Sequence, residues 1–360
     1  MEDGSDRRVL EADYGKYTRR KVLFISACLI ICFLAVGTSV TVGGRELSII
    51  DVYRTIFNHL AGHDFIQGTT EWMDDYIVWN VRLPRAIFGI VAGAGLAVAG
   101  ATMQSVMKNP LADPYTTGIS SGACFGVAIV ATLGISVMSG DSGLAPVVNA
   151  FVFALIPMLV IVLIAPRDGT SPATLILAGV AISFLFNAMT TIILTFTDSE
   201  TLADVYEWQI GTLTNITWGS VPVPLVITIL GTIAMTVLSR KLNIISLGDE
   251  QATSLGVSVE RMRMVLLILI SMIVASVVAY AGIIGFIGLI APHIVRMLID
   301  SDNRFVIPGS AMFGATFLLS CDIIVRMLSD VEAIPVGVVV SFVGAPIFLY
   351  LIVRRSKSMW

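Results

Sequence analysis

Few side chains in this sequence could carry out acid–base, nucleophilic or metal chemistry. Three ionisable groups, His293, Arg296 and Asp322, stand within long apolar runs, where a charge is costly and therefore faces a protein interior or an interface. Carboxylates are almost absent from the centres of these runs, and no HExxH motif or acidic pair accompanies the histidines. The residues therefore indicate neither a proton relay nor a catalytic centre.

A metal site at the surface would have to use His59 and His63, which are four residues apart with Asp64 beside them. Surface helices often carry unrelated histidines, so we predict no metal site. The GxxxxGKS/T loop that binds nucleotide phosphates does not occur in the sequence. If the protein moves a substrate uphill, the energy must come from another chain or from an ion gradient.

The elements that position these groups follow from the composition. Of the 360 residues, 56% are hydrophobic and only 13% are charged, and the mean hydropathy is +0.88, whereas soluble domains carry about 25% charged residues. This composition excludes a soluble enzyme and a disordered protein, and the net charge of −4 offers no basic field for nucleic acid. The cysteines, each alone within an apolar run, are interpreted as small hydrophobic residues: Cys28, Cys32, Cys124 and Cys321. The sequence predicts a polytopic membrane protein.

The predicted fold is an all-α bundle of about ten transmembrane helices. A spanning helix needs about 20 apolar residues, and ten runs meet or approach this length. They cover residues 22–42, 86–107, 118–138, 145–165, 173–196, 221–238, 264–282, 283–299, 305–325 and 336–353. The first run is too long for a cleaved signal sequence, so we keep it as a span. The boundary between the seventh and eighth runs, near residues 280–288, is the least defined.

The basic residues predict the orientation of the bundle. With ten spans both termini lie on one side, and 17 of the 22 Lys and Arg residues fall in segments on that side. Because Lys and Arg accumulate in cytoplasmic segments, we place both termini in the cytoplasm and the protein in the cytoplasmic membrane. Residues 1–21 and 354–360 are then cytoplasmic tails, and residues 22–353 form the transmembrane domain.

Two polar segments between spans are long enough to hold structure of their own. The outer segment, 43–83, has apolar residues at 49, 52, 53, 56, 57 and 60, which predicts an amphipathic helix lying on the membrane or on the bundle. The inner segment, 240–263, contains Gly248 and Gly256 and is the longest cytoplasmic loop. It has room for two short helices joined at a glycine, and it could contact a partner.

The run from Gly282 to His293 has glycine at every third position and then Pro292, which suits a continuous helix poorly. Non-helical backbone at membrane depth is tolerated where it is buried in protein or lines a watery cavity. This run therefore indicates either part of a transport pathway or a simple helix kink.

Several ordered motifs resemble the permease subunits of iron-chelate and cobalamin ABC importers, the FecCD-type family. They are RLPR at 82–85, GAGLAVAGATMQ at 93–104, NPLADP at 109–114, GDEQATSLG at 248–256, GFIGLIAPHIVR at 285–296, DIIVR at 322–326, IPVG at 334–337 and GAP at 344–346. The resemblance extends from about residue 20 to the C-terminus. It implies a type II importer permease with ten spans per subunit, working as a homodimer with the pathway between the two copies. It also implies an extracytoplasmic binding protein and two separate ATPase subunits. ATP-Mg would be bound by these ATPase subunits and not by this chain.

The resemblance also implies site residues. The ATPase-coupling loop would comprise Gly248, Asp249, Glu250, Ala252, Leu255 and Gly256. The binding protein would dock through Arg82, Arg85 and Arg326, since guanidinium groups suit bidentate contacts with carboxylates; lipid-headgroup contact is the alternative for these arginines. We further expect Asn187, Thr190 and Thr191 to line the pathway, and Thr170 and Ser171 to lie at an inner gate.

The sequence as a whole predicts the membrane subunit of an ATP-driven importer for a metal chelate, such as a ferric siderophore, haem or a corrinoid. One alternative is an ion-coupled secondary transporter. Others are a same-family importer of an oxyanion such as molybdate, or a receptor or scaffold with no transport activity.

Overall fold

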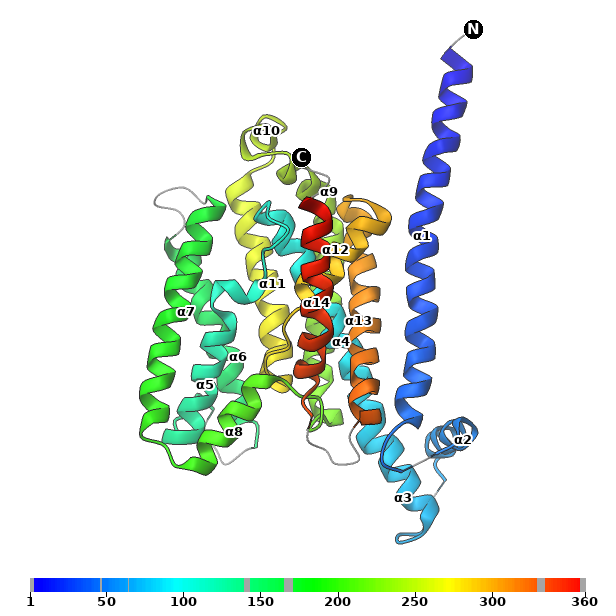
Figure 1. Ribbon diagram of the computed structural model, residues 1–360, viewed down its shortest axis with the longest axis vertical. Helices are drawn as coiled ribbons and strands as arrows, with labels where there is room; N and C mark the ends of the chain where they lie inside the picture. The colour runs from blue at the N-terminus through cyan, green and yellow to red at the C-terminus, as the bar shows by residue number, and fades with distance from the viewer. Residues whose placement is uncertain are drawn as a thin grey trace.

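The computed structural model describes residues 3–45, 47–63, 65–138, 143–164, 171–328 and 334–356. Within these residues the fold is entirely helical, and the long helices run roughly parallel or antiparallel in one bundle (Figure 1). Seven of the helices in the described part of the chain are long and apolar enough to cross a membrane. They are α1 (Asp3–Thr41), α4 (Leu83–Val106), α6 (Ala145–Ile164), α7 (Pro172–Thr195), α9 (Pro222–Ser246), α11 (Val259–Ala281) and α13 (Asn303–Leu328).

Three shorter apolar helices complete the bundle: α5 (Ile119–Leu133), α12 (Ile287–Ile299) and α14 (Val336–Ser356). Each of the ten predicted spans overlaps one of these ten described helices, so the structure confirms an all-α membrane fold. Short helices occupy the two ends of the bundle (Figure 1). At one end, called the α10 end, lies α10 (Asp249–Ser254); at the other, called the α2 end, lie α2 (Ile49–Leu60), α3 (Thr70–Tyr76) and α8 (Ser199–Ile210).

The core is built around α4, which packs against α9, α11, α12 and α13 and is buried along most of its length. Gly93 of α4 faces the backbone of Gly314 in α13, and Gly100 faces the backbone of Gly288 in α12. A β-carbon at Gly93 or Gly100 would collide with that backbone. Small residues therefore bring the helices of this bundle close together, as they do in lipid-embedded proteins generally.

The helical structure is interrupted between α11 and α12, where the glycine and proline pattern predicted a break. Residues 282–286 are non-helical, and Phe286 has a positive φ of 65°. Two carbonyls at this break accept hydrogen bonds from within the protein. The Tyr115 hydroxyl donates to Ile284 O at 3.2 Å, and the Thr212 N–H donates to O of Ala281, the last residue of α11, at 2.8 Å. Gly282 and Ile284 are buried and the other three residues are half-buried, so the break is packed against protein and also open to a hollow, the two settings in which irregular backbone is tolerated within a membrane.

The structure corrects the expectation of two short helices within residues 240–263. Helix α9 continues to Ser246 and α11 begins at Val259, so only α10 lies between them. The reason is that Leu242 and Ile245 are fully buried and extend the apolar face of α9 by two turns. By contrast, the amphipathic helix predicted over the apolar positions from 49 to 60 is present as α2.

Candidate functional site

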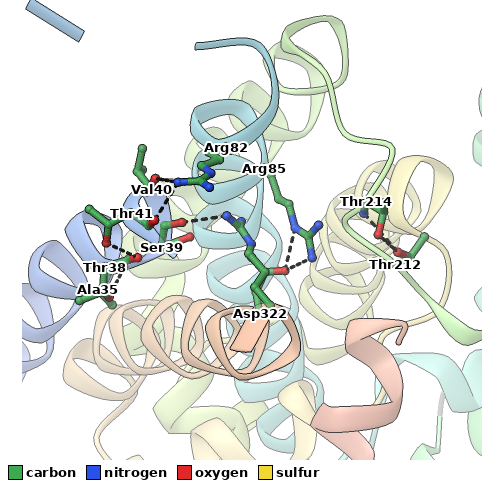
Figure 2. A network of polar contacts seen from close by, with 11 residues as sticks. Ala35, Thr38, Ser39, Val40, Thr41, Arg82, Arg85, Thr212, Thr214 and Asp322 are labelled. Carbon is green, nitrogen blue, oxygen red and sulfur yellow. Dashed lines mark hydrogen bonds and ion pairs between the residues drawn. The ribbon is translucent and has the colours of Figure 1, made fainter. Parts of the chain in front are cut away.

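The structure gathers the three arginines that the sequence singled out, at the α2 end of the bundle (Figure 2). Arg85 of α4 donates from Nε and Nη2 to Asp322 Oδ1, at 2.9 and 2.7 Å. Arg326 donates from Nη2 to Asp322 Oδ2 at 2.6 Å. Asp322 is fully buried, whereas the Arg85 and Arg326 side chains are 12% and 8% exposed. One buried carboxylate therefore bridges two guanidinium groups from neighbouring helices.

Arg82 has a different environment, against the last turn of α1. It lies in a short π-helical turn, η1 (Ile77–Arg82), and is 4% exposed. Its guanidinium donates to the carbonyls of Val40, Thr41 and Arg45 at 2.9, 2.7 and 2.6 Å. The final carbonyls of a helix lack partners within the helix, and a cation there also interacts favourably with the helix dipole. Arg82 therefore caps the end of α1 and offers little free surface to another molecule.

Arg326 also helps to cap the end of α1, because its Nη1 donates to Ser39 O of α1 at 2.8 Å. We call the group formed by Arg82, Arg85, Asp322 and Arg326 the arginine cluster. It carries three positive charges and one negative charge and joins α1, α4 and α13. Asp322 was not among the predicted site residues, although its spacing of four from Arg326 on a helix is the typical spacing of an ion pair.

At the α10 end, the predicted coupling loop is held to the bundle by Asp249. Lys108 Nζ, just beyond α4, lies 2.7 Å from Asp249 Oδ1, and Arg263 Nη2 of α11 lies 3.0 Å from the same oxygen. Arg263 is 1% exposed, whereas Asp249 is 40% exposed. Partial burial raises the pKa of the Asp249 carboxyl, but the hydrogen bonds from Lys108 and Arg263 outweigh this effect, and the pKa lies below its ordinary value.

The other predicted residues of this loop divide into a buried group and an exposed group. Ala252 is fully buried and packs against Ile245 of α9. Glu250, Leu255 and Gly256 are exposed, and Leu255 is an apolar side chain left 62% accessible to solvent. Gly248 and Gly256 both adopt positive φ, 134° and 80°, and they bracket α10 where the chain turns. The loop is thus a rigidly attached projection with an exposed outer surface.

The predicted pathway residues on α7 do not share one environment. Thr190 is 6% exposed, and its hydroxyl donates to Phe186 O at 2.9 Å. Asn187 and Thr191 are exposed on another face of α7. Ser171 caps the start of α7 by accepting a hydrogen bond from Thr174 N at 3.1 Å, whereas Thr170 lies outside the described residues.

An open hollow of about 730 Å³ lies elsewhere, between α8, α14 and the break that precedes α12. Its lining is apolar or neutral throughout: Gln209, Ile210, Ile283, Gly285, Phe286, Gly337, Val338, Ser341, Phe342, Ala345 and Pro346. None of the predicted pathway residues belongs to this lining. The break itself, which the sequence did associate with a pathway, does contribute to it.

No group of three or more His, Cys, Asp or Glu side chains that could hold a metal ion occurs within the described part of the chain. His59 Nδ1 instead lies 2.8 Å from Asp75 Oδ1. The four cysteines are all buried and free, which agrees with their interpretation as small hydrophobic residues.

The described residues include seven helices long and apolar enough to cross a membrane, which indicates a multi-pass membrane protein. Residues 28–354 match the FecCD transport family, and the chain belongs to this family. The cobalamin import system permease protein BtuC of Halobacterium salinarum is 38% identical over 281 residues, covering 78% of this chain and 74% of that protein. The hemin transport system permease protein HmuU of Yersinia pestis is 34% identical, covering 92% and 95% respectively. The solved structure of an inward-facing metal-chelate-type ABC transporter has a TM-score of 0.80 and 27% identity, covering 92% of this chain and 98% of that one.

Proposed function

We propose that this chain is the translocating subunit of an ATP-driven importer that carries a bulky metal chelate, such as a ferric siderophore, haem or a corrinoid. The observation that carries the proposal is the match to the FecCD transport family over almost the whole chain. The relatives reported above are permeases of hemin and cobalamin transport systems. We expect ATP-Mg to be bound by a separate partner subunit and this chain to bind no cofactor.

The ATPase subunits would contact the α10 projection. The exposed Leu255 and Glu250 provide an apolar and a charged contact on its outer surface. Because Asp249 ties the start of α10 to both Lys108 and Arg263, a movement imposed on the projection would be passed to the ends of α4 and α11. Rigid-body transmission of this kind is a common way to switch transporters between conformations.

The binding protein would dock at the α2 end, over the arginine cluster. The cluster has a net charge of +2, which would attract acidic residues on a partner and orient their approach. Arg85 is the most exposed of its three arginines, although only modestly so. This orientation puts the α10 end and both termini in the cytoplasm, in agreement with the distribution of Lys and Arg.

The pathway would form between two copies of the chain, in which the exposed apolar side chains of α14 face each other. Phe342 is 81% exposed and also lines the hollow beside α8. The neutral lining of this hollow favours a large ligand held by weak contacts. It offers no cationic side chain for an oxyanion such as molybdate, which makes this same-family alternative less favourable.

The proposal is tested by the rate of ATP hydrolysis in a complex of this chain, its ATPase and its binding protein in lipid nanodiscs. The binding protein is added empty or loaded with a ferric siderophore, haem, cobalamin or molybdate. We expect one chelate-loaded form to stimulate hydrolysis and molybdate to have no effect. Stimulation by molybdate alone would contradict the proposed substrate class, and failure of the chain to associate with any ATPase would contradict the proposed mechanism.

A further inference from the structure

Helix α2 leaves a continuous apolar stripe uncovered. Ile50, Tyr53, Phe57 and Leu60 are 77%, 50%, 71% and 70% exposed. Their spacings of three, four and three residues place them along one side of the helix. Four large apolar side chains exposed in a row on a 12-residue helix indicate a contact outside the chain itself.

Contacts on another side of α2 fix the rotation of the helix about its axis. Val52 is 2% exposed and packs against a cluster that includes Val40 of α1 and Val78 of η1. His59 Nδ1 lies 2.8 Å from Asp75 Oδ1 of α3, and the His59 ring stacks on Trp79 with ring centroids 4.0 Å apart. These contacts hold one side of α2 to the bundle, so the exposed stripe cannot turn inward.

The direction of the stripe is given by Tyr53 and α1. The Tyr53 hydroxyl lies 3.3 Å from the position that a β-carbon on Gly37 would occupy. Gly37 lies within the membrane-spanning part of α1, Thr18–Thr41, one turn before its end. Tyr53 therefore reaches back along α1 toward the membrane. Phe33 and Leu34 are four and three residues before Gly37, which places them on the same side of α1, and they are 68% and 62% exposed.

We propose that α2 is an interfacial helix that inserts Ile50, Tyr53, Phe57 and Leu60 into the membrane leaflet at the α2 end. Its exposed Asp51 lies off the stripe and faces water, and Arg54 stands at the edge of the stripe, where its long side chain can extend to the headgroups. A helix with one apolar and one charged side lies at the boundary between headgroups and acyl chains, and tyrosine is favoured at that depth because it has an apolar ring and a polar hydroxyl.

Insertion would anchor more than α2 itself. His59 and Trp79 join α2 to α3 and η1, and η1 ends at Arg82, the residue that caps α1. The membrane surface would thus support the segment on which the arginine cluster is built. A protein partner is the competing occupant of the stripe, but such a partner would approach from water, whereas Tyr53 is directed along α1.

Site-directed spin labelling of the full chain in phospholipid vesicles tests the proposal. In a background with the four native cysteines replaced by alanine, a nitroxide is attached to Phe57→Cys or Ile50→Cys, and the matched control label is placed at Asp51→Cys. Collision of each label with oxygen, which concentrates in lipid, is compared with collision with a water-soluble nickel chelate.

We expect oxygen to dominate at positions 50 and 57 and the nickel chelate to dominate at position 51, with no change when the binding protein is added. Because all three positions are exposed, the labels should leave the fold intact. Dominance of the nickel chelate at both 50 and 57 would overturn the proposal. So would protection of these two positions that appears only with the binding protein, since it would identify the stripe as a protein-docking surface.

Discussion

Replacing Asp322 with asparagine should destabilise the protein more than any single change at its surface. The substitution keeps the shape of the side chain but removes the negative charge that pairs with both Arg85 and Arg326, which are 12% and 8% exposed. Breaking a buried ion pair by removing one partner typically costs about 3–5 kcal/mol, because the remaining charge stays buried without compensation. Here two guanidinium groups lose their shared partner, so we expect a loss at the upper part of that range.

The assay is the free energy of unfolding of the purified protein in mixed micelles with increasing SDS. Arg45→Gln is the matched control, because Arg45 forms an ion pair with Asp74 at 2.5 Å but is 40% exposed; we expect it to cost about 0–1 kcal/mol. The double variant Asp322→Asn with Arg326→Gln should lose less stability than the two single losses added together, since it leaves fewer unpaired charges. A cost for Asp322→Asn no larger than that of Arg45→Gln would refute the interpretation of the cluster as a buried ion-pair network.

Three further predictions concern other parts of the chain. Replacing Arg82 with glutamine leaves the carbonyls at the end of α1 without a charged donor. The free energy of unfolding, measured in the same assay, should fall by about 1–3 kcal/mol. An unchanged value would mean that water replaces the arginine cap at no cost. Asp249→Asn should preserve folding, as judged by size-exclusion chromatography. It should lower ATP-driven uptake in proteoliposomes, because the α10 projection loses its ion pairs with Lys108 and Arg263. Normal uptake would show that these ion pairs do not transmit motion. Partial burial of Asp302 opposes ionisation, but hydrogen bonds from Arg304 and Asn243 outweigh this effect and lower the pKa of Asp302 from 3.8 to about 2. The contribution of the Asp302 carboxylate to stability is therefore present above about pH 4 and is lost as the pH falls toward 2. A stability profile for Asp302→Asn that falls as steeply as that of the wild type over this range would contradict this prediction.

The sequence was sufficient to predict the bundle because each span is a long apolar run, and apolar length is the dominant signal in a membrane protein. The break before α12 was also predictable, because glycine and proline disfavour a helix for local reasons. The extension of α9 through Leu242 and Ile245 was missed because polar neighbours on the opposite side of the helix made this segment resemble a loop. Only the packing of these two residues in the folded chain reveals the longer helix.

The arginine cluster shows the limit of prediction from residue type. Three arginines in polar or interfacial positions predict contacts with a partner, and the structure adds a structural role for Arg82, which donates to backbone carbonyls about forty positions away in the sequence. Backbone acceptors leave no signature in the sequence, so this role required the three-dimensional arrangement. Asp249 is a similar case, because its partner Lys108 is distant in the sequence and belongs to another helix end.

The central claim is that this chain is a transport conduit energised by a separate ATPase. It is tested most directly by uptake of a radiolabelled iron chelate into proteoliposomes. One set of proteoliposomes contains the chain alone, and the other contains the chain with its ATPase subunits. Both sets receive the loaded binding protein, and ATP is supplied on the ATPase side. We predict accumulation only when both the ATPase and ATP are present. Accumulation by the chain alone, driven by a sodium or proton gradient, would contradict the claim.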